Sequence, residues 1–314
     1  MVQVDLITGF LGAGKTTFLR RYAAYLTAQG HHVCILENDF GAVNVDAMLV
    51  QDLLGERCEI ETISGGCDCD THQRRMRTKL ISMAMRGFDR VVVEPSGIFD
   101  VDEFFDVLRD DPLDRWYQIG NVIAIVDAML PETLSPQAEY ILASETANAG
   151  RVLLSRTKQA GPERCKAAAA HLTRALEGCK CSRRFAPEEI ITKDWADLTD
   201  EDLAAIAACG TRQASCEKLH FDEHEAFSSL CFLEQHLTLA QLQAAADRLF
   251  ADAACGHVLR VKGFAPDPQG ETGWLELNAT AAGKTLAPIP AGQEVLIVIG
   301  EGLDKAAIEA RLHG

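Results

Sequence analysis

Short apolar runs alternate with longer amphipathic stretches over the first two thirds of the chain. The apolar runs predict strands at residues 4–7, 32–36, 90–93, 121–126, 151–154 and 189–191. Between the strands, apolar residues recur at helical spacing, as over residues 16–27 and 163–176. Strands that alternate with helices are typical of a parallel sheet. We therefore expect an α/β domain with a mostly parallel sheet over residues 1–205.

The pattern becomes polar and irregular between about residues 192 and 227. Beyond this stretch, the sequence predicts strands at residues 228–232, 257–262, 273–277 and 294–299, and helices at residues 239–250 and 304–312. Strands that run between two helices indicate a small α+β sandwich with its helices on one face. We expect a linker over residues 206–226 and a second domain over residues 227–314.

The composition is that of an acidic globular protein of 314 residues with a formal net charge of -16. Nucleic acids and anionic membranes attract clustered Lys and Arg, so neither is expected as a partner. The chain starts directly in its first strand, which leaves no room for a leader, and no apolar run has membrane-spanning length. A cytoplasmic protein is expected. Its 11 cysteines are expected to be free thiols or metal ligands in a reducing compartment.

The first predicted strand runs directly into a glycine-rich loop, Gly9-Phe10-Leu11-Gly12-Ala13-Gly14-Lys15-Thr16-Thr17. This is the complete P-loop pattern, at the expected place between a strand and a helix. The backbone N–H groups of such a loop point at phosphate oxygens beside a helix N-terminus. Lys15 would bridge the β- and γ-phosphates, and Thr16 would ligate Mg²⁺. A glycine-rich turn without a ligand would not require the complete pattern.

A second carboxylate-bearing strand end supports the same site. The strand at residues 90–93 continues into Glu94-Pro95-Ser96-Gly97. This order places Glu94 at the carboxyl edge of the sheet, where Mg²⁺ and the attacking water are expected. Gly97 would offer a backbone N–H to the γ-phosphate, so its position can report the nucleotide state. The sequence thus predicts a P-loop nucleoside triphosphatase with Lys15, Thr16 and Glu94 as its catalytic residues.

Further motifs follow in a fixed order along the chain. They are residues 8–17, Glu37-Asn38-Asp39-Phe40-Gly41, Ser64-Gly65-Gly66-Cys67, Glu94-Pro95-Ser96-Gly97, Val126-Asp127-Ala128, Arg260-Val261-Lys262-Gly263-Phe264 and Ile297-Val298-Ile299-Gly300. In this order the chain resembles the CobW-like P-loop GTPases, relatives of the UreG and HypB metallochaperones, over nearly its whole length. The resemblance implies a GTPase domain followed by a small CobW-type domain. It also implies that GTP binding and hydrolysis deliver a metal ion or cofactor to a client.

The resemblance also suggests a transition-metal site. In such proteins, residues 37–41 form a mobile switch, and a Cys-x-Cys-Cys element after a Gly-Gly pair binds the metal. Here the element is Cys67-Asp68-Cys69-Asp70, with aspartate in place of the third cysteine. Two thiolate ligands favour Zn²⁺, and Co²⁺ and Ni²⁺ are the alternative metals. The candidate ligands are Glu37, Asp39, Cys67, Cys69, Asp70 and His72; the alternative is that the cysteines are only small residues in a tight loop.

The base-recognition motif departs from the family pattern. After the strand at residues 151–154, the family carries Asn-Lys-x-Asp, whereas this chain has Ser155-Arg156-Thr157-Lys158. The family's aspartate accepts hydrogen bonds from guanine, whereas a lysine can only donate. Arg156 could lie against a purine ring, and Lys158 could donate to O6 or N7 of guanine, or to a ring nitrogen of adenine. GTP is expected as the nucleotide by resemblance, with ATP as the alternative.

Two smaller features stay open. Cys179-Lys180-Cys181 is a second CxC pair, either an auxiliary metal or redox site or a pair of ordinary reduced loop residues. His220 and His224 lie among acidic residues near the expected domain boundary, where a solvated linker is the simpler interpretation.

The combined prediction is a GTP-hydrolysing metallochaperone or metal insertase. It would couple nucleotide state to the binding and delivery of Zn²⁺, Co²⁺ or Ni²⁺ to a client metalloprotein, with Mg²⁺ as the nucleotide's cofactor. A nucleotide- or metal-dependent homodimer is compatible with this mechanism. The alternative is a nucleotide-gated assembly or activation factor for a metalloenzyme or corrinoid protein, which carries no metal itself.

Overall fold

A computed structural model describes residues 1–39, 50, 53–64, 69–97, 101–214, 216–217, 227–267, 270, 273–281, 283–289 and 292–313, with the backbone only for residues 38, 39, 64 and 69–72. Contacts divide the chain into two compact units. The first unit comprises Met1–Phe40 and Val50–Leu219, and the second comprises Gly41–Leu49 and His220–Gly314. Each unit has its own hydrophobic cores and is described separately.

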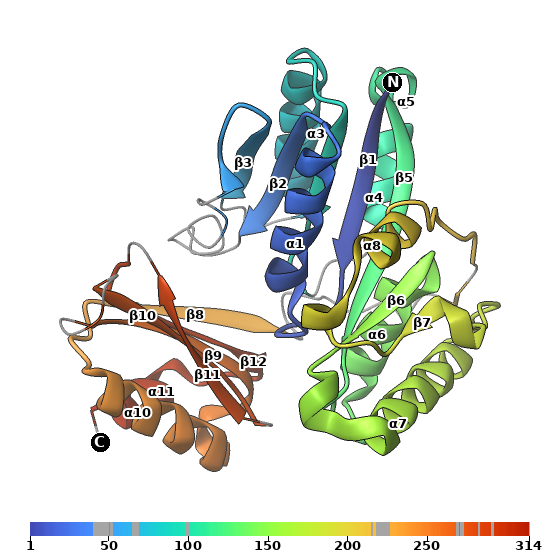
Figure 1. Cartoon of the computed structure of the whole chain (residues 1–314). Helices are drawn as coiled ribbons and strands as arrows, with labels where there is room; N and C mark the ends of the chain where they lie inside the picture. The colour runs from blue at the N-terminus through green and yellow to red at the C-terminus, as the bar shows by residue number, and fades with distance from the viewer. Residues whose placement is uncertain are drawn as a thin grey trace. The chain divides into compact units, whose positions relative to one another are not determined.

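The first unit is built on a parallel sheet. Its described strands have the order β3-β2-β4-β1-β5-β6-β7 (Figure 1). They are β1 (Val2–Thr8), β2 (Val33–Asp39), β3 (Cys58–Ser64), β4 (Arg90–Glu94), β5 (Tyr117–Asp127), β6 (Arg151–Ser155) and β7 (Ile190–Ile191). All pairings within this sheet are parallel. The expected α/β fold class is therefore confirmed.

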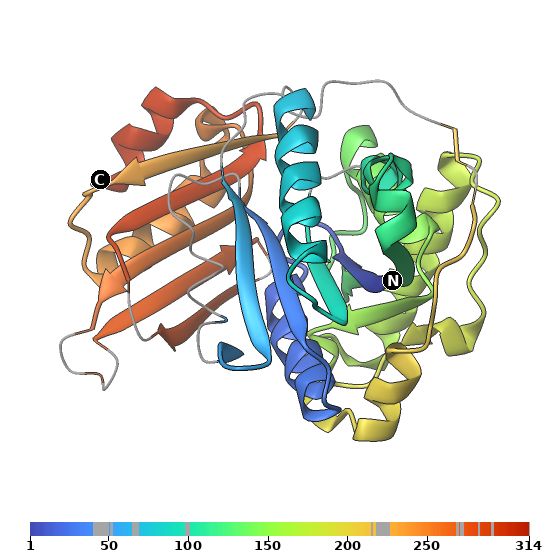
Figure 2. The same ribbon diagram turned by 90° about the horizontal axis from the view of Figure 1, so that it is seen from above.

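Helices cover both faces of this sheet. They are α1 (Lys15–Ala28), α3 (Cys69–Ala84), α4 (Val101–Arg109), α5 (Leu113–Trp116), α6 (Pro136–Ala147), α7 (Thr157–Gly178) and α8 (Asp200–Ile206). One core joins the sheet to α1 and α8, and another joins its opposite face to the remaining helices. Figure 2 shows α1 and α3 on opposite sides of the strands. Both faces of a parallel sheet are buried in this way, which explains why its strands appear as continuous apolar runs.

The segment expected to link the domains belongs largely to the first unit. Leu203 and Ile206 of α8 are buried against α1, in the same core as Phe18. Beyond α8, the amide of Gly210 donates to Asn121 Oδ1 at 2.8 Å, and Thr211 forms a β-bridge with Ala149. Residues 206–214, 216 and 217 therefore extend the first unit, whereas the sequence places the linker at residues 206–226. These contacts join segments that are distant in the sequence, so the local polar pattern does not reveal them.

The second unit is an antiparallel sheet with helices on one face. Its strands have the order β11-β10-β9-β12-β8, comprising β8 (Ser228–Leu233), β9 (His257–Pro266), β10 (Trp274–Thr280), β11 (Gly283–Ile289) and β12 (Val295–Glu301). The helices α10 (Leu239–Ala251) and α11 (Lys305–Leu312) share one core with the sheet, and a smaller apolar cluster lies apart from it. This arrangement matches the expected small α+β domain.

None of the helices that the structure describes is long and apolar enough to cross a lipid bilayer.

Candidate functional site

The glycine-rich loop leaves β1 in conformations that glycine favours. Gly9 has φ 144°, and a Cβ there would lie 2.2 Å from the carbonyl oxygen of Ile125. Gly14 directly precedes α1 and, with φ 104°, adopts a left-handed conformation. The loop therefore ends at a helix N-terminus, where free N–H groups and the helix dipole favour phosphate. Gly12 and Ala13, also proposed as phosphate-binding residues, are buried within this loop.

Lys15 and Thr16 open the helix and turn back towards the sheet. Lys15 is 8% exposed, and its Nζ donates to the carbonyl oxygen of Gly9 at 2.8 Å. This bond folds the lysine over the loop, where its charge can neutralise phosphate oxygens. Thr16 Oγ1 donates to Glu94 Oε1 at 2.8 Å, whereas Thr17 is exposed.

The Thr16–Glu94 pair joins the loop to the end of β4. Glu94 is 7% exposed and forms part of a strand whose residues are all buried. A hydroxyl and a carboxylate at hydrogen-bond distance are the hard oxygen donors that Mg²⁺ prefers. These residues therefore fit the expected magnesium site, at which the ion would neutralise charge on the β- and γ-phosphates.

Gly97 lies directly against the phosphate loop. A Cβ on Gly97 would be 2.6 Å from the backbone nitrogen of Leu11 and 2.9 Å from Lys15 Nζ. Only a residue without a side chain fits between these groups. The backbone at Gly97 therefore packs directly against the phosphate loop.

Replacing Gly97 with alanine is expected to weaken nucleotide binding, because the loop or the segment after β4 must shift. Overpacking of this kind costs about 1–3 kcal/mol, which corresponds to a loss in affinity of about 5- to 150-fold. Titration with a fluorescent GTP analogue measures the change. Gly55→Ala is the matched control, because nothing lies within 4 Å of a Cβ at Gly55. Equal affinities of the two variants would contradict the steric argument.

The expected base-recognition residues lie beside the same loop. Ser155 ends β6, and its Cβ lies 3.7 Å from the position of a Cβ on Gly14. Arg156 has φ 54° and donates from Nη2 to the carbonyl oxygen of Gly12 at 3.1 Å. It also forms an ion pair with Asp127, at the end of β5. Burial raises the pKa of Asp127, and Arg156 opposes this shift.

A loop that sequence reasoning missed completes this side of the site. The indole ring of Trp195 lies 3.1 Å from the position of a Cβ on Gly14, and it packs edge to face on Phe18 of α1. Arg21 donates to the carbonyl oxygens of Trp195 and Leu198, which fixes the loop against the helix. Trp195 is a large aromatic residue within an otherwise polar stretch, and such a residue indicates that the segment packs against the rest of the domain. Residues 194–198 lie within the first domain expected from the sequence, but their polar and irregular pattern predicts no helix or strand there.

Lys158, at the start of α7, forms ion pairs with two carboxylates of this loop. Its Nζ lies 3.2 Å from Asp194 Oδ1 and 3.2 Å from Asp197 Oδ2. These two hydrogen bonds raise the pKa of Lys158. Desolvation acts to raise the pKa of Asp194, but the Ala196 N–H and Lys158 hold it below its usual value. Asp194 is therefore a carboxylate at neutral pH.

Comparison with protein families identifies the type of domain to which this site belongs. The sequence model of the CobW/HypB/UreG nucleotide-binding domain matches residues 3–183, more than half of the chain. The chain belongs to the CobW/HypB/UreG family. The expected identity as a CobW-like P-loop GTPase is thereby confirmed at the level of the family.

Several curated proteins are similar to this family member. The zinc chaperone YjiA of Escherichia coli is 34% identical over 171 residues, which cover 51% of each chain. The zinc chaperone YeiR of E. coli is 30% identical over 131 residues, covering 41% of this chain and 39% of YeiR. The chain thus spans about half or less of the length of these two relatives. The zinc chaperone CobW of Pseudomonas aeruginosa is 25% identical over 356 residues, covering 99% of this chain and 91% of that protein.

Among solved structures, the Zn(II)-bound YjiA GTPase from E. coli aligns with 99% of this chain and 97% of its own, at 22% identity and a TM-score of 0.36.

The proposed transition-metal residues of this CobW-like chain are only partly described. Glu37, on β2, is 2% exposed and lies in register with Glu94 on the neighbouring strand β4. Asp39 ends β2, and Cys69 and Asp70 begin α3, but their side chains lie outside the described residues, as does that of His72. Cys67, His220 and His224 lie outside them altogether. Among the described side chains, no group of three His, Cys, Asp or Glu is arranged to hold a metal ion.

The second CxC pair behaves differently from the expected free thiols. Cys181 forms a disulfide with Cys216, and their Cα atoms are 4.0 Å apart. The segment after α8 crosses the end of α7, where the Glu217 amide donates to the carbonyl oxygen of Cys179 at 2.9 Å. This crossing brings together cysteines that are 35 positions apart in the sequence. The expectation that the cysteines are free thiols or metal ligands is therefore wrong for Cys181 and Cys216.

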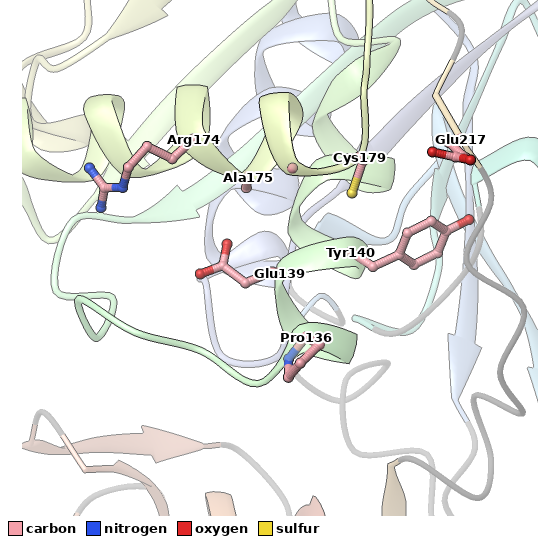
Figure 3. A pocket seen from close by; sticks show the side chains of 8 residues that line it. Pro136, Glu139, Tyr140, Arg174, Ala175, Cys179 and Glu217 are labelled. Carbon is pink, nitrogen blue, oxygen red and sulfur yellow. The ribbon is translucent and has the colours of Figure 1, made fainter.

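Cys179 lines a cavity of about 510 Å³ between α6 and α7, together with Glu139, Tyr140, Arg174 and Glu217 (Figure 3). The cavity lies at the end of α7 opposite to Arg156 and Lys158. Burial raises the pKa of the Cys179 thiol, and the charge of Glu139 adds to this effect. The thiol is therefore protonated at neutral pH, which does not favour a nucleophilic or metal-binding role.

Proposed function

We propose that this chain is a GTP-hydrolysing metallochaperone, which couples its nucleotide state to the binding and delivery of a divalent transition metal to a client metalloprotein. In this proposal, Lys15 binds the phosphates, and Thr16 and Glu94 bind Mg²⁺. The backbone N–H of Gly97 donates to the γ-phosphate and is released when that phosphate is lost. Family membership supports the nucleotide chemistry. The relatives YjiA, YeiR and CobW, which are named zinc chaperones, support Zn²⁺ as the cargo.

The observation that carries the proposal is the register of Glu37 and Glu94 on the paired strands β2 and β4. Glu94 accepts the hydrogen bond of Thr16 and so belongs to the magnesium side of the site. Glu37 lies beside it, at the same carboxyl edge of the sheet. One pair of neighbouring carboxylates can therefore border both the nucleotide and the cargo metal.

The remaining cargo ligands are connected to the same edge through β3. Strand β3 pairs with β2 such that Ser64 lies in register with Asp39. The element Cys67-Asp68-Cys69-Asp70 follows within a few residues, and α3 begins at Cys69. Thiolates and carboxylates together suit a tetrahedral Zn²⁺ site. A nucleotide that orders this edge would therefore raise the affinity for Zn²⁺, and Zn²⁺ would raise the affinity for the nucleotide by the same factor.

Calorimetric titration of Zn²⁺ tests this coupling. The protein, in Mg²⁺ and a phosphine reductant, is titrated with a nonhydrolysable GTP analogue present, with the ATP analogue, and without nucleotide. We expect one Zn²⁺ per chain and an affinity about 5- to 150-fold higher with the GTP analogue. Binding should disappear in the Cys67→Ser/Cys69→Ser variant.

The matched control is Cys179→Ser/Cys231→Ser, which removes two half-buried cysteines that are not among the proposed ligands. It should bind Zn²⁺ as the unmodified protein does. Zn²⁺ binding that is absent, or that depends neither on nucleotide nor on Cys67 and Cys69, would refute the metallochaperone. That result would favour a nucleotide-gated assembly factor that carries no metal.

A further inference from the structure

At the position where the family pattern has a guanine-binding aspartate, this chain has a lysine of opposite charge, Lys158. The structure places two carboxylates beside this lysine. Its Nζ is held between Asp194 and Asp197, each at 3.2 Å. The carboxylates come from the loop after β7, and Lys158 follows the neighbouring strand β6. Both segments therefore leave the sheet at the same edge as the phosphate loop.

Three contacts place this group of charges beside the phosphate loop. Trp195, the neighbour of Asp194, has its ring 3.1 Å from the position of a Cβ on Gly14. Arg156, two residues before Lys158, donates to the carbonyl oxygen of Gly12 at 3.1 Å. The Ser155 side chain also approaches Gly14. Strands β6 and β7 lie on the opposite side of β1 from β4, so the charged pair borders the side of the loop that faces away from Glu94. A nucleoside bound through its phosphates would extend to this side if Mg²⁺ lies at Glu94.

This border also contains polar atoms that lack a partner. Ser155 is 4% exposed, and within the described part of the chain its hydroxyl has no hydrogen-bond partner. The same holds for the indole Nε1 of Trp195. Buried polar groups are nearly always paired in folded proteins, so orphaned groups at one place indicate a ligand or water that pairs with them.

We propose that Lys158 and Asp194 together read the Watson–Crick edge of guanine, with Lys158 donating to O6 and Asp194 accepting from N1–H and N2–H. This inference rests on the proposed nucleotide-binding function. Adenine presents an amino group where guanine has O6, and a bare ring nitrogen where guanine has N1–H. It would therefore place a donor against the ammonium and an acceptor against the carboxylate, which excludes ATP.

Of the two carboxylates that pair with Lys158, Asp194 is better placed than Asp197 to accept hydrogen bonds from guanine. Its side chain is 22% exposed, compared with 58% for Asp197. Asp194 Oδ1 accepts the Ala196 N–H at 3.0 Å, which fixes the orientation of the carboxylate. A carboxylate offers about four acceptor positions on its two oxygens. Asp194 therefore retains acceptor positions for both N–H groups of guanine.

Exchange of the base tests this assignment. Xanthine has O6 and N1–H as guanine does, but it carries a carbonyl at C2 instead of the amino group. An amide at position 194 can accept from N1–H and donate to this carbonyl. We expect Asp194→Asn to lower the affinity for a nonhydrolysable GTP analogue by about 10- to 100-fold. The same variant should bind the XTP analogue more tightly than the GTP analogue.

Two further variants distinguish the contribution of Lys158 from that of Asp194. Lys158→Met should weaken GTP and XTP analogues in parallel, because both bases present O6, and should reduce the preference for GTP over ATP. Asp200→Asn, at an exposed carboxylate on α8, is the control and should bind the GTP analogue within about threefold of the unmodified protein. Affinity for the ATP analogue in Asp194→Asn, expected to be no lower than before, reports an intact phosphate loop.

The possible outcomes are distinct. A protein that binds the GTP analogue tightly, and whose Asp194→Asn variant retains that affinity without gaining XTP, overturns the guanine-reading pair but not the nucleotide-binding function. A loss of affinity for the GTP and ATP analogues alike in Asp194→Asn would assign the residue a structural role and also overturn it. An unmodified protein that binds none of the three analogues would refute the proposed function itself.

Discussion

Replacing Lys15 with alanine is expected to lower the affinity for nucleoside triphosphates by about 30-fold or more. The side chain is buried over the phosphate loop, and its ammonium lies 2.8 Å from the carbonyl oxygen of Gly9. Removing one partner of a buried, hydrogen-bonded charge pair costs about 2–5 kcal/mol, and a cost of about 2 kcal/mol is a factor of about 30. Titration with fluorescent GTP and ATP analogues in Mg²⁺ measures the loss.

A matched lysine separates the local effect from the general loss of a charge. Lys166 is an exposed lysine on α7 that pairs with Glu163. Lys166→Ala should bind both nucleotides as the unmodified protein does. If Lys15→Ala retained its affinity for triphosphates, the loop would not be the phosphate site, and the nucleotide-dependent mechanism would lose its basis.

Replacing Arg90 with methionine is expected to lower the free energy of unfolding of the first unit by about 3–5 kcal/mol. Asp5 is fully buried in the middle of the sheet, and Arg90 Nη1 donates to its carboxylate at 2.5 Å. The same carboxylate accepts from Tyr22 Oη at 2.8 Å and from the backbone N–H of Asn121 at 2.8 Å. Without Arg90, a carboxylate would remain buried with no countercharge, which is the source of the cost.

Urea denaturation followed by the fluorescence of the first unit's tryptophans, Trp116 and Trp195, measures this loss. The control is Arg115→Met, since Arg115 forms an exposed ion pair with Asp111. Exposed pairs contribute about 0–1 kcal/mol. A destabilisation by Arg90→Met no larger than that of the control would show that the buried carboxylate does not depend on Arg90.

The parts of the candidate site that could be predicted from the sequence are those built from adjacent residues. Residues 9–17 form a loop and a helix start, and their function depends on the order of glycines, Lys15 and Thr16 within one segment. Glu94 could be predicted because it ends a clear apolar strand, and the carboxyl ends of parallel strands lie at one edge. The hydrogen bond between Thr16 and Glu94 is consistent with that expectation.

The elements that sequence analysis missed lack an apolar signal. In strand β3, at the sheet edge, polar residues alternate with apolar ones. Two of the polar residues, Glu59 and Glu61, form ion pairs with Arg86. Strand β11 is exposed along nearly its whole length. Edge strands are held by backbone hydrogen bonds and cross-strand neighbours, and neither leaves an apolar run in the sequence.

The sequence by itself determined the α/β class, the phosphate loop, the carboxylate at the end of β4 and the family, because these depend on local order and on periodic burial. The tertiary structure decided the other side of the site. It brought Trp195 against Gly14, and Lys158 between Asp194 and Asp197. Away from the site, beyond the opposite end of α7, it paired Cys181 with Cys216. These pairs come from segments separated by a helix or more. No local pattern encodes them, since they form only when the strands of the sheet align and bring the connecting segments together.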